Sequence, residues 1–148
     1  MMFFVFMGIS NDYDDLVISG KVCIVDTDFA KVKELVMAGD NACVLALNAV
    51  RSMANKDDYG LVLSSFCSGL LSYTSGFLLA CGIEVESEHS FLALCARYPC
   101  LELDYATLVS IQLRSGSNLS FTEWKKVEFY LRMYMGMLRE YSGEQRWR

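Results

Sequence analysis

Residues 29–54 carry an apolar stripe at the spacing of an amphipathic helix. Asp26, Thr27 and Asp28 stand just before it, where side-chain oxygens can accept the unpaired N–H groups of a first helical turn. The pattern therefore predicts a helix that packs one face against the rest of the chain. The residues that share this face are Val32, Leu35, Val36, Gly39, Cys43, Ala46, Leu47, Val50, Met53 and Ala54.

The middle of this stripe holds three poor helix formers in a row, Gly39, Asp40 and Asn41. Glycine inside a helix costs about 1 kcal/mol relative to alanine, so the run needs a reason. One explanation is a helix boundary with Gly39 as the C-cap. The other is contact, because glycine lets a neighbouring backbone come close and Asp40 offers a carboxylate to a cation. The pattern alone leaves both open.

Residues 60–83 form a stretch of 24 residues without a charge, which is long enough to span a membrane. It contains six Ser or Thr and four Gly, however, and has no basic cluster at either flank. We therefore expect a helix buried by its neighbours, ended by Gly82. Its bulky face is expected to comprise Leu63, Phe66, Leu70, Tyr73, Phe77 and Leu78.

The remaining pattern is mostly helical. Residues 12–25 are rich in β-branched side chains and favour a strand. Helices are expected over residues 88–98, where Pro99 stops the helix, over residues 101–114, and after Ser120 or Thr122 as the cap. The sequence predicts one all-α domain over residues 1–148, a bundle of about six to eight helices around a buried hydrophobic helix.

Composition limits the function classes. The chain of 148 residues is 53% hydrophobic and 21% charged, and its net charge of −5 argues against a nucleic-acid-binding surface. Its six cysteines form no C-x-x-C pair, which favours a reducing, intracellular location. His89 is the single histidine, and no nucleophile motif or zinc-ligand spacing accompanies it. We expect no enzymatic activity, catalytic residue, metal or cofactor.

The segment from Leu35 to Asp40 has the form Leu-x-x-Ala-Gly-Asp. It resembles the third homology motif of the Bcl-2 family of apoptosis regulators. The segment from Gly82 to His89 follows 42 residues after Asp40, near where the family places its first homology motif. Trp124, Phe129, Tyr134 and Gly136 loosely resemble the second homology region. The resemblance would make residues 12–25 the first helix, whereas their propensity favours a strand. The resemblance implies a divergent viral pro-survival protein that sequesters amphipathic pro-death helices in a hydrophobic surface groove, in the host cytoplasm or at mitochondria.

The family's Asn-Trp-Gly-Arg is missing at residues 86–89, so His89 or Arg97 would replace the arginine that grips the ligand's aspartate. A second register, at residues 58–61, also lacks the arginine. Because the chain has few charges to keep an apolar groove soluble, we expect a C2 homodimer in which each groove is partly covered by the partner. We expect no transmembrane span in this chain. The implied groove residues are Ala46, Val50, Met53, Phe77, Leu78, His89, Leu92 and Arg97, and the homology-motif residues are Leu35, Gly39 and Asp40.

A second resemblance is to the HEPN helical domains, which include ribonuclease toxins and partners of nucleotidyltransferases. Residues 58–59 and the step from Gly82 to His89 resemble the family's second helix and the loop after it. The segment from Arg114 to Phe121 resembles its terminal arginine motif, but no histidine follows the arginine. This alternative implies a catalytically inactive domain that acts as a nucleotidyltransferase partner or in RNA-linked defence.

Overall fold

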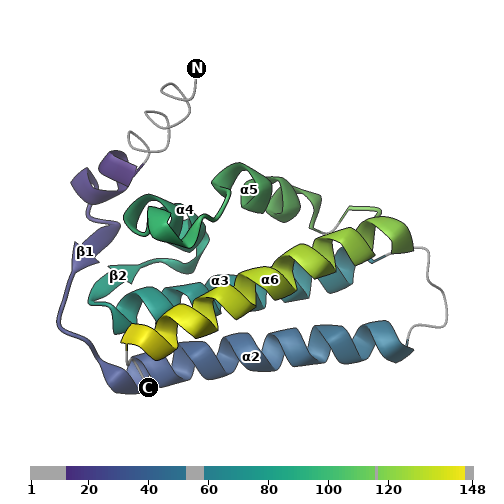
Figure 1. The fold of residues 1–148 in the computed structure, drawn as a ribbon, viewed down its shortest axis with the longest axis horizontal. Helices are drawn as coiled ribbons and strands as arrows, with labels where there is room; N and C mark the ends of the chain where they lie inside the picture. The colour runs from purple at the N-terminus through teal and green to yellow at the C-terminus, as the bar shows by residue number, and fades with distance from the viewer. Residues whose placement is uncertain (1–12, 53–58, 116, 146–148) are drawn as a thin grey trace.

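Three long helices dominate the computed structural model, which describes residues 13–52, 59–115 and 117–145 (Figure 1). Helices α2 (Phe29–Ser52) and α3 (Gly60–Ala80) run antiparallel along each other, and α6 (Phe121–Gln145) crosses α3 obliquely. Two short helices, α4 (Ser90–Arg97) and α5 (Tyr105–Arg114), cover another side of α3. The expected all-α bundle is confirmed.

Helix α3 is the centre of the core. All six bulky residues predicted to face inward are buried, and Leu63, Leu70 and Leu78 are completely enclosed. Helix α3 is long and apolar enough to cross a membrane by length and composition, but 61% of its most apolar window is buried inside the protein. A core helix passes the same test, so the burial agrees with the expected central helix.

Helices α2 and α3 approach each other at glycines. A Cβ atom on Gly39 would lie 2.6 Å from the Gly69 carbonyl oxygen, and one on Gly69 would lie 2.9 Å from the Gly39 carbonyl oxygen. Helix α2 continues through Gly39 without a break, so the helix-boundary explanation is wrong. The contact explanation is confirmed, because neither glycine has room for a side chain.

A small sheet ties the start of the chain to the end of α3. Strand β1 (Val22–Ile24) pairs antiparallel with β2 (Ile83–Val85), placing Val22 opposite Val85. Residues 13–18 are helical, so the strand expected over residues 12–25 is only partly present. Gly82 has φ of +83°, the left-handed conformation that ends α3 where the sequence predicted.

The last two helices begin at side-chain caps. Asp104 accepts a hydrogen bond from the Ala106 N–H, so α5 starts after it and not at the expected residue 101. Residues 99–101 form instead the 3₁₀ turn η2 (Pro99–Leu101). Ser120 and Glu123 bond to each other's backbone N–H groups at the start of α6, which confirms Ser120 as the cap.

Candidate helix-binding groove

The apolar residues of the implied peptide groove lie mostly inside the core. Phe77 and Leu78 are 1% and 0% exposed, and Ala46 and Leu92 are also buried. Val50 is half-buried, and Met53 lies outside the described residues. In this conformation these side chains pack on other core residues, as Phe77 does on Tyr98, and do not form an open surface.

The three motif residues on α2 point in different directions. Gly39 is buried against α3, whereas Leu35 is half-buried beside a hollow next to β2. Asp40 is half-buried and faces α6, where its Oδ1 lies 3.7 Å from an Arg139 guanidinium nitrogen. The motif therefore serves helix packing at Gly39 and an ion pair at Asp40.

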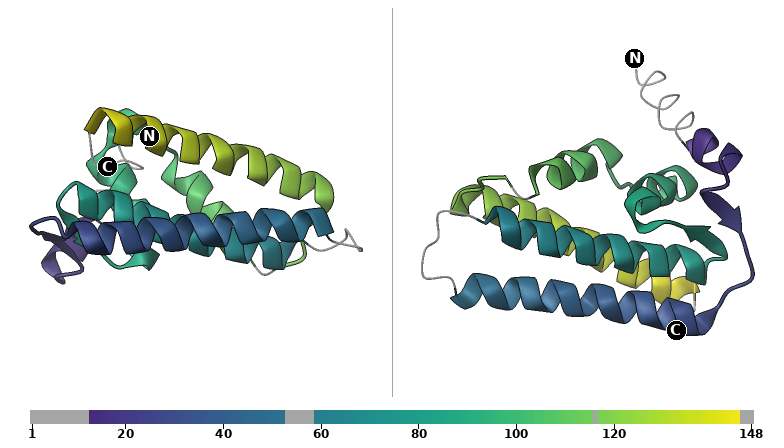
Figure 2. Two further views of the ribbon diagram at one scale, coloured as in Figure 1. Left: turned by 90° about the horizontal axis from the view of Figure 1, so that it is seen from below. Right: turned by 180° about the vertical axis from the view of Figure 1, so that it is seen from behind.

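A groove does exist between α2 and α6, with α3 at its floor. Both views of Figure 2 show α6 running obliquely to α2, so the two helices cross at an angle and do not lie parallel. The hollow measures about 390 Å³ and is mainly apolar at its floor and cationic on the α6 side. We call it the α2–α6 groove, and its lining residues are Asp40, Cys43, Val44, Leu47, Phe66, Arg132, Met135 and Arg139.

The arginines of this groove are held in place by neighbouring side chains. Arg139 pairs with Asp40 and hydrogen-bonds the Tyr73 side chain, although burial still raises the pKa of Tyr73. Arg132 donates from Nε and from a terminal nitrogen to Glu128 Oε2, at 3.3 and 3.0 Å. Both arginine side chains are more than half exposed, and guanidinium groups beside apolar surface suit a ligand that carries both apolar side chains and a carboxylate.

The thiol on the floor of the groove is unreactive. Burial and the nearby Asp40 carboxylate raise the pKa of Cys43 to about 12. Its Sγ lies 3.9 Å from the Phe66 carbonyl oxygen. A thiol that stays protonated at neutral pH is a poor nucleophile, so Cys43 acts as a small apolar floor residue.

His89 and Arg97, the expected partners of a ligand carboxylate, lie away from this groove, at the end of the 3₁₀ turn η1 (Ser87–His89) and the end of α4. Arg97 is exposed near the end of α4.

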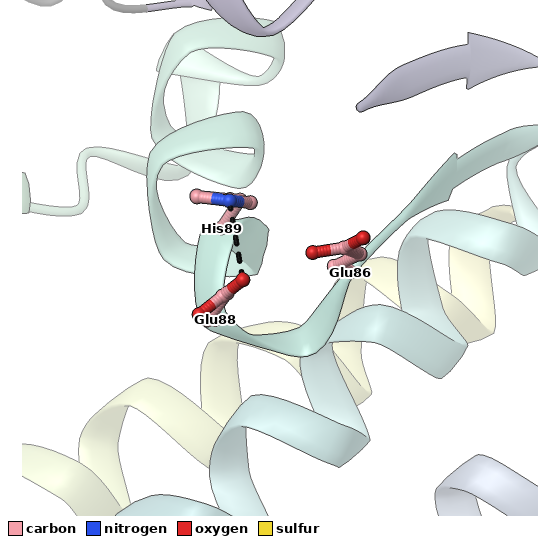
Figure 3. A group of neighbouring side chains, drawn as sticks. All are labelled: Glu86, Glu88 and His89. Atoms are coloured by element: carbon pink, nitrogen blue, oxygen red, sulfur yellow. Dashed lines mark ion pairs between the residues drawn. The ribbon is translucent and has the colours of Figure 1, made fainter. Parts of the chain in front are cut away.

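His89 Nε2 lies 3.5 Å from Glu88 Oε1, and Glu86 points toward the same place (Figure 3). The ligand atoms of these three residues lie within 4.8 Å of one another and could hold a metal ion. Both glutamates are exposed, and such acidic groups are common without a metal, so the group assigns no chemistry.

A second hollow contains the arginine of the HEPN-like segment. Arg114, at the end of α5, pairs with Glu123 and lines a hollow of about 370 Å³ with Lys126. The hydroxyl-bearing residues Thr107 and Ser110 line the same hollow. Arg114 is paired with Glu123 and the Thr107 hydroxyl donates to Asp104, so these groups already have partners within the protein.

Sequence reasoning missed Arg132 and Arg139. Together with Met135 they recur every three or four residues on one side of α6, which is the spacing of a helix face. The signal was present, but only the fold shows that this side of α6 faces α2.

No family model matches the chain, and no curated protein or solved structure matches it.

Proposed function

We propose that this protein is a non-enzymatic interaction protein that holds an amphipathic helix in the α2–α6 groove. The observation that supports the proposal is the groove itself, which combines apolar floor residues with two arginines on its α6 side. An amphipathic helix would place its apolar stripe on Phe66, Leu47 and Met135, and a carboxylate near Arg139. The resemblance of residues 35–40 to a Bcl-2 homology motif names the ligand class, the helices of pro-death proteins.

The α2–α6 groove avoids the main difficulty of the peptide groove that the Bcl-2 resemblance implies. Binding on Phe77 and Leu78 would require the core to open, whereas Val44 is 55% exposed at the rim of the α2–α6 groove. A ligand helix could therefore bind with little rearrangement. In this arrangement Arg139 or Arg132 would contact the ligand's aspartate, which is the role that the Bcl-2 resemblance assigns to the missing arginine.

A binding assay with labelled peptides tests the proposal. Fluorescence anisotropy would follow a panel of pro-death helices and scrambled peptides of the same composition. We expect saturable binding of at least one helix but of no scrambled peptide. Val44→Glu and Arg139→Glu should each weaken binding by about tenfold or more, which corresponds to about 1.4 kcal/mol. Leu61→Glu is the matched control, since Leu61 is exposed on α3 and does not line the groove. Equal affinity for helices and scrambled peptides would contradict the proposal.

The second candidate function is that of a catalytically inactive HEPN-like partner of a nucleotidyltransferase. It is favoured by the position of Arg114, which lies beside Lys126 in a hollow at the end of α5. Copurification with a nucleotidyltransferase that is lost in Arg114→Ala, and kept in Val44→Glu, would support this candidate over the first. The opposite result would support helix binding.

A further inference from the structure

The outward face of α6 carries a line of side chains that no described element covers. Phe129 is 67% exposed and Met133 is 54% exposed, although both are large and apolar. Lys126 precedes them and Glu140 follows them at helical spacing, with exposed Gly136 between. These five residues recur every three or four positions, so they share one face of the helix. We call this face the outer stripe; it comprises Lys126, Phe129, Met133, Gly136 and Glu140.

The outer stripe lies opposite the face that packs on α3. Trp124, Leu131 and Leu138 on that inner face are completely buried. Figures 1 and 2 show α6 at the outside of the bundle, with no described helix or strand over its outer side. A Cβ atom built on Gly136 would meet nothing within 4 Å, so the stripe has open space in place of a side chain one turn after Met133. We call this gap in the outer stripe the notch. Phenylalanine and methionine are enriched in protein interfaces, so their exposure on one helix face is consistent with an interaction surface.

The order of residues along the stripe makes it complementary to itself. Lys126 lies seven residues before Met133, and Glu140 lies seven residues after it. If two copies of α6 packed antiparallel with Met133 at the centre, Lys126 of each copy would face Glu140 of the other. Phe129 lies four residues before Met133 and Gly136 three residues after it, so each ring would meet the partner's notch. With the axis at Met133 the opposite charges lie directly across from each other, and each Phe129 ring is offset by one residue, about 1.5 Å, from the partner's notch.

We propose that the outer stripe is a homodimer interface, in which α6 packs antiparallel against α6 of a second copy about a twofold axis at Met133. A twofold axis brings the same patch of both copies together, which is what a self-complementary stripe requires. The stripe from Lys126 to Glu140 is about 21 Å long at 1.5 Å per residue. One helix pair of that length forms a small interface, so the dimer is weak and forms in the micromolar range.

This proposal goes beyond helix binding and is independent of it. The groove arginines Arg132 and Arg139 lie on the flank of α6 that faces α2, and neither belongs to the outer stripe. The dimer would leave the α2–α6 groove open, in contrast to the partner-covered groove that the sequence led us to expect. A dimer that binds no peptide, or a monomer that binds one, would separate the two proposals.

Charge reversal with rescue tests the register. Analytical ultracentrifugation of the full chain at low ionic strength would compare the wild type, Lys126→Glu, Glu140→Lys and the double variant. We expect each single variant to raise the dimer dissociation constant about tenfold, because two like-charged pairs then face each other. The double variant should return it to within about threefold of the wild type, because the opposite charges face each other again. Lys33→Glu is the matched control, since Lys33 is exposed on α2.

A second variant tests the notch. Gly136→Leu should weaken the dimer about tenfold because the new side chain fills the place of the partner's Phe129, and helicity should persist because leucine favours helix. Circular dichroism would verify the fold of every variant. A wild type that stays monomeric to millimolar concentration would overturn the proposal. So would a double variant that stays as weak as the single variants, or a Gly136→Leu variant that dimerises normally.

Discussion

Gly39 and Gly136 both sit inside long helices, and their surroundings differ completely. A side chain on Gly39 would collide with the Gly69 carbonyl, whereas one on Gly136 would meet nothing within 4 Å. At Gly39 the conformational cost of a glycine is offset by close contact between α2 and α3. At Gly136 nothing in the described monomer offsets it. Two phenylalanines differ in the same way: Phe66 is buried beside α2, while Phe129 is exposed on α6.

The largest expected effect is the difference in unfolding free energy between alanine substitutions of Phe66 and of Phe129. Phe66→Ala leaves a cavity beneath Trp124, whose ring centroid lies 6.1 Å from that of Phe66, and should lower the free energy of unfolding by about 3–5 kcal/mol. Phe129→Ala, the matched control, should change the unfolding free energy of the monomer by less than about 0.5 kcal/mol. Urea denaturation at low protein concentration measures both. Equal losses would show that the outer stripe is packed within the monomer.

The two glycines give the next largest difference, and here the two changes should have opposite signs. Gly39→Ala forces α2 and α3 apart and should destabilise the protein by about 1–3 kcal/mol. Gly136→Ala removes a poor helix former from an open site and should stabilise the monomer by up to about 1 kcal/mol. Thermal unfolding in dilute solution would measure both changes. A stabilising Gly39→Ala would mean that the close approach of α2 to α3 is absent.

The sequence predicted much of this contrast. The uncharged stretch at residues 60–83 predicted a buried helix, because few other places in a folded chain accept such a segment. The weak formers at residues 39–41 predicted either a boundary or a contact, and only the position of Gly69 on α3 decides between them. Helix spacing could have marked Phe129, Met133 and Gly136 as one face, but not as an exposed one.

Other features depend on contacts that sequence patterns do not encode. The pairing of β1 with β2 joins segments about 60 residues apart, and neither strand is long enough to show alternation. The α2–α6 groove depends on the angle at which α6 crosses α3, so Arg132 and Arg139 could not be assigned to it. The residues implied by the Bcl-2 resemblance, such as Phe77 and Leu78, are apolar for the different reason that they form the core.

A smaller effect is expected at the hydrogen bond that fixes the inner face of α6. Thr74 donates to the Leu70 carbonyl oxygen at 2.7 Å, so the hydrogen bond between its hydroxyl and that of Tyr134 has Tyr134 as donor. Burial raises the pKa of Tyr134 well above its ordinary value, so the phenol stays protonated. Tyr134→Phe should cost about 1 kcal/mol, because the buried Thr74 oxygen loses its donor. Chemical denaturation measures the loss, and Met133→Leu on the outer face should leave monomer stability unchanged.

The smallest expected effect is the pH dependence of the Asp104 cap at the start of α5. The Thr107 hydroxyl and the backbone N–H groups of Thr107 and Ala106 hold the pKa of Asp104 below its ordinary value. A carboxyl with a lowered folded-state pKa adds stability above its unfolded pKa of about 4. This stability is lost as the pH falls through the folded-state pKa.

Asp104→Asn should keep a capping oxygen and reduce the loss of stability below pH 4, whereas Asp104→Ala should also lose about 0.5–2 kcal/mol at neutral pH. Denaturation at a series of pH values would compare the two variants with the wild type. Since Asp104 is far more exposed than Tyr134, the pH-dependent part should be smaller than the Tyr134→Phe effect. An unchanged acid dependence in Asp104→Asn would show that the cap does not stabilise the charged carboxylate.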